Sequence, residues 1–360
     1  MTTEGPRKDH GTNLEPVVMR ESSLYPPVRE HRMRYRRDLG LAFAIALLYG
    51  VAASGGDQRP PFTLAVLRQD GILIPFATYD DEWKNAWPVP RIKLEIPVTL
   101  EAVPQNWWPG QRIQRHWTLW QSDGESRPLK ALAPVWFRAQ CLSNVGLRTD
   151  FTPKGPLAPP DAAPYPKEGL ATSVAPGVEP GIEPIAVLDD SSPDWKWVLE
   201  TLTVPFEKTE NEAIRGRGRK HPYNIRERAL RPIQLEALYR APDAAPGGFV
   251  FYFEAVRRYE EPKPKTRPSE PPCDVLTYAW GWVRLRPGGT SSTAIFAELT
   301  DCYRWNVSFV LPLGVMRTKI GQPLWIVQSS AWQGESYFVM ELVEPAKPNI
   351  LWQTPGGWCQ

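Results

Sequence analysis

The sequence has little of what most enzymes need for catalysis. It contains only four histidines, of which His116 and His221 lie beyond the N-terminal region. A nucleophile elbow, a zinc-protease helix motif, a glycine-rich phosphate loop and a zinc-deaminase signature are all missing. Folding could still assemble a Ser–His–Asp triad, because triads are defined by geometry and not by order. The composition therefore favours a non-catalytic protein, with a hydrolase of dispersed catalytic residues as the alternative.

An excess of charge of one sign is also lacking. The chain has 42 Lys and Arg against 40 Asp and Glu. A nucleic-acid or anionic-membrane partner requires a basic excess gathered on one face, so we expect no nucleic-acid partner. One stretch, Ile214–Arg231, is locally basic. Because its surroundings are neutral and no aromatic residues alternate with its charges, we predict a solvated loop there, with a nucleic-acid patch as the alternative.

Long apolar runs are absent except for Leu39–Ser54. A basic cluster of arginines precedes this run, and small residues close it, which is the layout of a secretory signal. A membrane-spanning helix usually needs about 20 apolar residues, and this run is shorter. We predict a signal peptide over residues 33–53, cut near Ala53. An uncleaved single-pass anchor is the alternative, and a membrane is expected only if Leu39–Ala53 is uncleaved.

The residues before the signal have no periodic pattern. Met33 stands directly before Arg34, and a start there would give a signal of ordinary size. We therefore interpret residues 1–32 as an over-extended start. A disordered tail in front of an anchor is the alternative.

The four cysteines form no CxxC pair, and no histidine stands at metal-ligand spacing from them. We expect no structural zinc, no other metal and no cofactor. In an exported chain an even number of cysteines is compatible with disulfides. A hairpin turning near Gly288-Gly289 would bring Cys273 and Cys302 within one register step. We predict the disulfide Cys273–Cys302 and, by elimination, Cys141–Cys359.

What the chain does contain is 40 prolines and 16 tryptophans. Proline is poorly tolerated inside helices and central strands, and tryptophan favours strands. We therefore predict a mostly β protein, with antiparallel hairpins and meanders in a sandwich- or barrel-like arrangement, Pro-rich loops and little helix after the N-terminal signal. Asp70-Gly71 and Pro287–Gly289 have the composition of hairpin turns. Pro75 predicts an edge or a bulge in the strand that follows the first turn.

The pattern along the chain predicts two β lobes, 57–150 and 193–360, joined by a Pro-rich linker over 151–192. From Thr152 to Pro184 the sequence is built of Pro, Ala and Gly and offers no face to bury. Other stretches carry predictions of their own: a half-buried strand over Arg91–Val103, a strand over Asp194–Glu207 and a short helix over Leu230–Ala241.

Tryptophans supply the candidate binding residues. Two pairs are spaced two residues apart: Trp195 with Trp197, and Trp280 with Trp282. On a strand both rings of such a pair face the same side, where they fill a core or, as the alternative, form a platform on which sugar rings stack. Trp107-Trp108 lies in a turn-like stretch, where both rings cannot enter one core. The candidate binding residues are therefore Trp107, Trp108, Trp195 and Trp197.

The carboxylate groups Asp80–Glu82 and Asp189-Asp190 are expected to be solvated turn residues, and no catalytic residue is assigned. The function predicted from the sequence is that of an exported, Trp-rich, non-catalytic β protein of the cell envelope or extracellular space. Its expected partner is a glycan or an envelope protein. A secreted hydrolase and a membrane-anchored structural protein are the alternatives.

Overall fold

The computed structural model describes the chain in segments, all within the compact unit Gly55–Gln360. These are residues 62–86, 115–121, 124–139, 142–159, 162, 164–174, 181–216, 221–259, 275–301, 309–317, 323–331, 334–343 and 346–358. Several predictions lie outside them: the N-terminal signal, the strand over Arg91–Val103, Trp107, Trp108 and the four cysteines.

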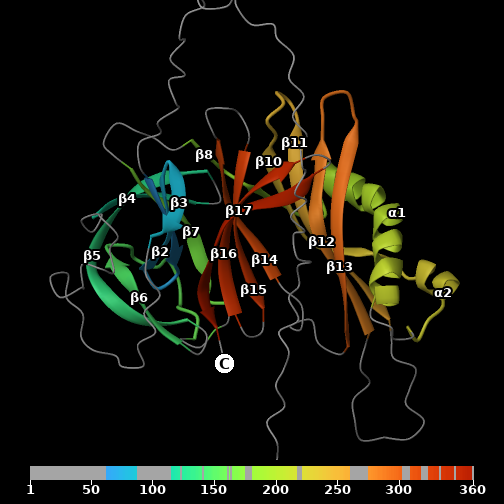
Figure 1. Cartoon of the computed structure of the whole chain (residues 1–360), viewed down its shortest axis with the longest axis horizontal. Helices are drawn as coiled ribbons and strands as arrows, with labels where there is room; N and C mark the ends of the chain where they lie inside the picture. Colours follow the sequence, from blue (N-terminus) through green and yellow to red (C-terminus); the bar gives the residue numbers. More distant parts are fainter. Residues whose placement is uncertain are drawn as a thin grey trace, which may run out of the picture. The chain divides into compact units, whose positions relative to one another are not determined.

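A six-stranded antiparallel barrel forms the first part of the described chain (Figure 1). Its strands follow the order β1-β7-β4-β5-β6-β2, the pairing of β1 with β2 closes it, and β3 extends β2. The bounds are β1 Phe62–Arg68, β2 Ile72–Asp80, β3 Glu82–Asn85, β4 His116–Trp120, β5 Ser126–Ala139, β6 Leu142–Thr149 and β7 Lys167–Val174. Its interior is filled by apolar residues, among them Leu67, Leu73, Trp117, Leu119, Leu129, Val145, Leu147 and Ala171.

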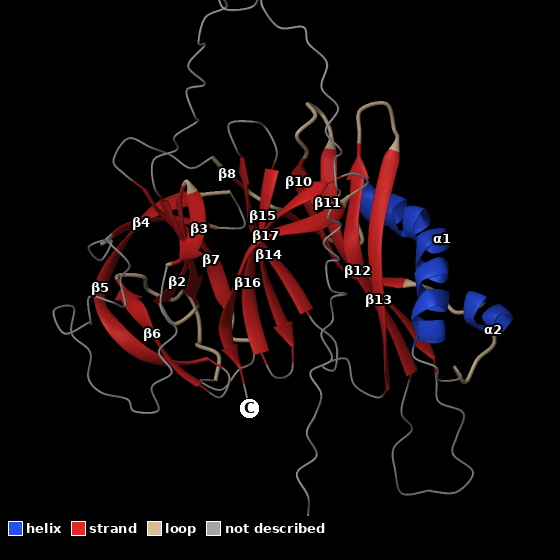
Figure 2. Ribbon diagram, viewed as in Figure 1, coloured by secondary structure: helices blue, strands red, loops and turns tan. Residues whose placement is uncertain are grey.

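Two five-stranded antiparallel sheets complete the β structure, which dominates the ribbon (Figure 2). We call them sheet B, with the order β17-β16-β15-β14-β8, and sheet C, with the order β13-β12-β11-β10-β9. Sheet B consists of β8 Ile182–Glu183, β14 Phe309–Arg317, β15 Pro323–Ala331, β16 Gly334–Val343 and β17 Lys347–Trp358. Sheet C consists of β9 Ala186–Leu188, β10 Gln234–Pro242, β11 Phe249–Tyr259, β12 Val275–Leu285 and β13 Ser291–Asp301.

Sheet B is buried on both faces, as the alternation along β15 shows. Ile326 belongs to a core that it shares with the barrel residues Phe76 and Leu170. Its neighbour Trp325 belongs to a second core, which it shares with Tyr252 of sheet C. Successive strand residues point to opposite faces, so β15 contributes to both cores. The barrel and sheet C therefore each bury a face against sheet B.

Helix α1, Pro193–Gly216, covers the other face of sheet C, and the short helix α2, Ile225–Ala229, follows it (Figure 1). The buried positions of α1 include Val198, Leu202 and Phe206, spaced by four residues along one helical face. They pack in one core with Phe251 and Phe253 of β11. An apolar stripe against a sheet, more than helix propensity, is the main source of stability for such a helix.

The mostly antiparallel β fold expected from the sequence is confirmed, together with both hairpins. Gly71 has a φ of 79° between β1 and β2, and the second turn joins β12 to β13 at Gly288 and Gly289. The bulge predicted at Pro75 is present, because the β1–β2 register shifts between Leu64 and Ala65, which pairs with Pro75.

Four local predictions were wrong, three of them in the stretches 152–184, 194–207 and 214–231. The segment 152–184 was expected to be a linker that buries no face, but it contains β7, which lies between β1 and β4 in the barrel. Its small residues permit this close packing: a Cβ on Gly169 would lie 2.3 Å from the carbonyl oxygen of Trp120. The predicted strand over Asp194–Glu207 is part of α1, and the basic stretch from Ile214 contributes the end of α1 and all of α2.

The predicted helix over Leu230–Ala241 is instead strand β10. Leu235 and Leu238 are both buried in the core under α1, although they are three residues apart. A register shift between Leu235 and Ala237 inserts one extra residue into this strand. Such a bulge turns a spacing of two into a spacing of three, which imitates helical periodicity.

Candidate functional site

A cavity of about 220 Å³ lies where the barrel, sheet B and sheet C meet. The barrel contributes Trp120 of β4 and the start of β7, and sheet C contributes Tyr239 of β10. Sheet B contributes Ile182, Glu183 and the Leu311–Leu313 stretch of β14. Concave sites where separate substructures meet are where small ligands usually bind, so this cavity is the candidate site.

Two aromatic side chains line the cavity, and each also contacts a neighbouring side chain outside the cavity lining. Trp120 is half-buried, and its Nε1–H donates a hydrogen bond to the Thr172 hydroxyl at 3.0 Å. Tyr239 packs against Tyr252, with 6.0 Å between the ring centroids. Burial, reinforced by the nearby Glu254 carboxylate, raises the pKa of Tyr239 above its ordinary value. Tyr239 is therefore a neutral hydroxyl donor at the wall of the cavity.

The polar lining includes two side chains that are not engaged elsewhere. Gln121 and Glu168 make no side-chain hydrogen bond or ion pair within the part of the chain that the structure describes. Glu183 forms an ion pair with Arg317, whereas its second oxygen, Oε2, is buried and has no hydrogen-bond partner among the described residues. A buried carboxylate oxygen without a partner is costly. Gln121 and Glu168 therefore offer the cavity acceptors, and Tyr239 offers a donor.

Lys167 also borders the cavity, but its ammonium group points into the protein. Nζ donates to the carbonyl oxygen of Tyr165 at 2.7 Å and to Glu335 Oε2 at 3.3 Å. Burial lowers the pKa of Lys167, and the neighbouring Glu335 opposes this effect. Only 2% of the Lys167 side chain is exposed. Lys167 therefore joins the barrel to sheet B and contributes no free charge to the cavity.

The rim of the cavity depends on a glycine in the turn after β4. Gly124 has a φ of 85°, in the left-handed region, and a Cβ there would lie 3.2 Å from the ring of Pro184. Glycine is the residue that adopts this conformation without steric cost. The turn can therefore approach the segment between β8 and β9 closely, which narrows the cavity.

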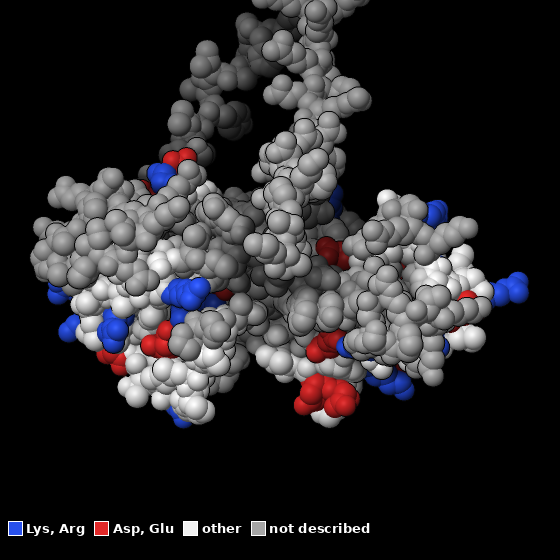
Figure 3. Space-filling view, turned by 90° about the horizontal axis from the view of Figure 1, so that it is seen from below, with Lys and Arg blue, Asp and Glu red and all other residues white. Residues whose placement is uncertain are grey.

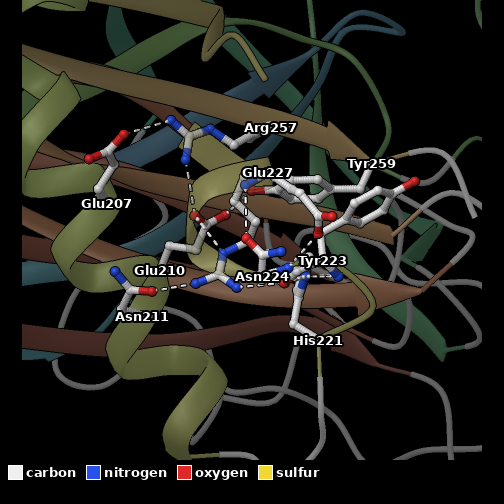
Figure 4. A network of polar contacts seen from close by, with 10 residues as sticks. Glu207, Glu210, Asn211, His221, Tyr223, Asn224, Glu227, Arg257 and Tyr259 are labelled. Carbon is white, nitrogen blue, oxygen red and sulfur yellow. Dashed lines mark hydrogen bonds and ion pairs between the residues drawn. The ribbon is translucent and has the colours of Figure 1, made fainter. Parts of the chain in front are cut away.

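A second polar cluster lies where α1, α2 and β11 meet (Figure 4). Glu210 of α1 is its centre: Arg257 Nη1 donates to it at 3.0 Å, and the hydroxyl of Tyr259 donates at 2.6 Å. Arg228 of α2 lies 3.5 Å from the same carboxylate, and Glu207 pairs with Arg257. Burial and the Glu210 carboxylate raise the pKa of Tyr259. Two carboxylates thus face two guanidinium groups, which balances the buried charge.

The sequence-predicted tryptophans have different surroundings from those expected. Trp195 and Trp197 lie on α1, where residues two apart point about 200° from each other, so they do not form a single-faced strand platform. Both are half-buried against the core under α1, and the Trp197 ring lies 5.6 Å from that of Phe251. In contrast, Trp280 and Trp282 share one face of β12 as expected, with ring centroids 5.9 Å apart, in the core with sheet B.

The other candidates are not gathered at one place. His116 begins β4 and is exposed, whereas His221 contacts Tyr259 of β11 with 4.6 Å between the ring centroids. Asp80–Glu82 and Asp189-Asp190 are exposed, as expected of turn residues. Within the described ranges, no three His, Cys, Asp or Glu side chains are grouped so that they could hold a metal ion.

The sequence did not identify Trp120 and Tyr239 as candidate binding residues, because no local pattern distinguishes an aromatic strand residue that lines a cavity from one that fills a core.

Comparisons with protein-family models, with curated proteins and with solved structures found no match to this chain. Among the helices that the structure describes, none is long and apolar enough to cross a membrane.

Proposed function

We propose that this chain is an exported, non-catalytic binding protein of the cell envelope or extracellular space, and that the cavity between Trp120 and Tyr239 holds one ring of a glycan. The observation that carries the proposal is the lining of this cavity, in which an aromatic ring stands beside polar groups not engaged elsewhere. Sugars present apolar C–H faces and a rim of hydroxyl groups. The C–H face of a sugar packs on an aromatic ring. Side chains such as Gln121 and Glu168 form hydrogen bonds with its hydroxyl groups.

The size and polarity of the cavity support this ligand class. A cavity of about 220 Å³ is small for a drug-sized ligand and suits a single hexose ring. Its lining combines polar side chains such as Gln121 and Glu168 with apolar ones such as Leu311, unlike the mainly apolar sites that take lipids. The hydroxyl of Tyr239 provides a donor for a neutral polyol, and the carboxylate of Glu168 provides acceptors.

The proposal is tested by binding of neutral oligosaccharides, such as cello-, laminari- and chito-oligosaccharides, measured by isothermal titration calorimetry. We expect Trp120→Ala to weaken binding by about tenfold or more. Trp352→Ala is the matched control, because Trp352 packs on the same core as Trp120 but does not line the cavity. Equal losses in both variants, or no binding of any sugar by the native protein, would exclude the cavity as a sugar site.

A secreted hydrolase remains the alternative, and one observation favours it: Glu168 and Glu183 line the same cavity. Glycoside hydrolysis uses two carboxyl groups about 5–10 Å apart on either side of the bond. If the native protein releases new reducing ends from an oligosaccharide, and both Glu168→Gln and Glu183→Gln abolish this release, the protein is a glycoside hydrolase. Loss of turnover in His116→Ala or His221→Ala, with folding intact, would instead identify dispersed catalytic residues. Binding without turnover supports the non-catalytic protein.

Export is tested on the native protein from its source cells, fractionated and alkylated without reduction. We expect a species that begins near residue 54, outside the cytoplasmic membrane, with no alkylated cysteine. This result would support cleavage after Ala53 and the disulfides Cys273–Cys302 and Cys141–Cys359. A membrane-bound species that retains Leu39–Ala53 and has alkylated thiols would favour the anchored alternative.

A further inference from the structure

A groove of about 690 Å³ runs between the C-terminal end of α1 and helix α2. It is an open surface groove, distinct from the cavity between the three sheets. Side chains of both helices line it: Asn211, Ile214, Arg215, Asn224, Ile225, Arg226 and Arg228. Its polar lining contains three guanidinium groups and two amides but no carboxylate, whereas the face drawn in Figure 3 carries residues of both charges.

The floor of the groove is fixed by Arg228, of which only 5% is exposed. Its Nη1 donates to the carbonyl oxygen of Tyr223 at 2.8 Å, and its Nη2 donates to Asn211 Oδ1 (Figure 4). Because Asn211 accepts through its oxygen, its amide nitrogen remains available as a donor. The charge of Arg228 is balanced by Glu210 below it. The charge of the floor is therefore balanced without any ligand.

The walls carry charge that is not balanced. Arg215 of α1 and Arg226 of α2 are exposed, and neither forms an ion pair or a side-chain hydrogen bond with the residues that the structure describes. The acidic residue nearest to them in α2, Glu227, is engaged with the backbone N–H of Asn224 in a capping box. Two guanidinium groups that face one groove repel each other unless an anion lies between them.

We propose that this groove binds a phosphate-type oxyanion, with Arg215 and Arg226 as the two clamping residues and Asn211 as a further donor. Guanidinium groups recognise such oxyanions through paired N–H donors, and this geometry is why arginine is preferred over lysine for phosphate. The ligand is either a free phosphate monoester or the headgroup of an anionic phospholipid, which present the same chemistry. The near-neutral chain as a whole disfavours a nucleic acid, which needs a broad basic face.

The test uses the full chain and isothermal titration with inorganic phosphate and glycerol 3-phosphate, alongside sedimentation with vesicles of phosphatidylglycerol and phosphatidylcholine. In the double variant Arg215→Gln/Arg226→Gln we expect affinity to fall by about tenfold or more and the salt dependence to flatten. Lys196→Gln/Lys208→Gln is the matched control, because it removes two exposed positive charges from α1 but none from the groove. We expect that control to bind like the native chain.

The titration and the vesicle sedimentation together distinguish a free phosphate ligand from a phospholipid headgroup. Arginine-dependent binding of the small phosphates identifies a soluble ligand, whereas arginine-dependent binding of anionic vesicles alone identifies a headgroup. Both results support the groove as the site. If both double variants lose affinity equally, the net charge of the protein explains the binding, and the proposal is overturned. Binding of neither probe, or of an oligonucleotide but neither phosphate source, would overturn it as well. Thermal melting of each variant verifies that these exposed substitutions leave the fold intact.

Discussion

At the scale of single residues, two groups of buried ionisable side chains bring opposite charges together. Lys167 faces Glu335 at the boundary between the barrel and sheet B, and Arg228 and Arg257 face Glu210 under α1. Desolvation cancels most of the Coulomb attraction in such groups, so their net contribution to stability is small. Removing one member is a different matter, because it leaves a buried charge without a partner.

The Lys167–Glu335 pair gives the sharpest prediction of this kind. Glu335→Gln would leave the Lys167 ammonium, 2% exposed, without its counter-charge. We expect the free energy of unfolding to fall by about 3–5 kcal/mol, measured by urea denaturation at pH 7. Glu82→Gln, which breaks an exposed ion pair with Lys84, is the control and should have no measurable effect. If the two variants unfold at the same urea concentration, the buried pair is not structurally important.

The buried tyrosines predict how stability depends on pH. Desolvation, aided by neighbouring glutamates, raises the pKa of Tyr252, Tyr259 and Tyr337 in the folded protein. Above the unfolded pKa of about 10, the unfolded chain releases these protons while the folded protein keeps them. The linkage relation then requires stability to be constant below that pH, as far as these groups are concerned, and to fall as pH rises above it.

Unfolding free energies at pH 8, 10 and 11 measure this effect. We expect the native chain to lose stability between pH 10 and 11, and Tyr259→Phe to lose less over that interval because one of the tyrosines with a raised pKa is gone. Lys167 acts in the opposite direction, since its pKa is lowered in the folded state, but the tyrosines with a raised pKa outnumber it. A Tyr259→Phe variant with the same alkaline slope as the native chain would contradict the assignment.

At the scale of the secondary-structure elements, composition and glycine turns in the sequence were sufficient to predict a mostly β fold and the hairpins β1–β2 and β12–β13. They were insufficient where packing overrode the local pattern. Val198, Leu202 and Phe206 recur every four residues, which is a helical signal, but the alternation of Trp195 and Trp197 suggested a strand. The bulge in β10 and the close approach of β7 to β4 depend on partners remote in sequence, so no local pattern reveals them. The same holds for the cavity, which three sheets form together.

In sheet C, the close contact between β12 and β13 restricts one position of β12 to glycine. Gly281 of β12 pairs with Ile295 of β13, and a Cβ at Gly281 would lie 2.1 Å from the carbonyl oxygen of Ala294. Because backbone atoms in a sheet cannot move aside without breaking the ladder, we expect Gly281→Ala to cost about 1–3 kcal/mol or more. Gly155→Ala is the control, since nothing lies within 4 Å of its Cβ position. Chemical denaturation of both variants tests this, and equal stability would show that the strands can separate locally.

At the scale of the whole molecule, sheet B determines how the described parts depend on one another. It shares one core with the barrel and another with sheet C. Its strand β8 comes from the middle of the chain and pairs with β14, while β15, β16 and β17 follow later in the sequence. The barrel strands therefore cannot bury their outer face until residues near the C-terminus have been placed. This arrangement predicts that the two lobes expected from the sequence do not unfold independently.

Trp325 provides the means to test this dependence, because it is fully buried in the core between sheet B and sheet C, away from the barrel. We expect Trp325→Ala to lower the unfolding free energy by about 3–5 kcal/mol and to do so in a single transition. Tryptophan fluorescence, far-UV circular dichroism and hydrogen exchange of the barrel strands should all shift to the same urea concentration. Leu132→Ala, at a position that is 46% exposed, is the control and should leave all three probes unchanged. Barrel protection that survives in Trp325→Ala after sheet C has unfolded would instead show that the barrel is an independent domain.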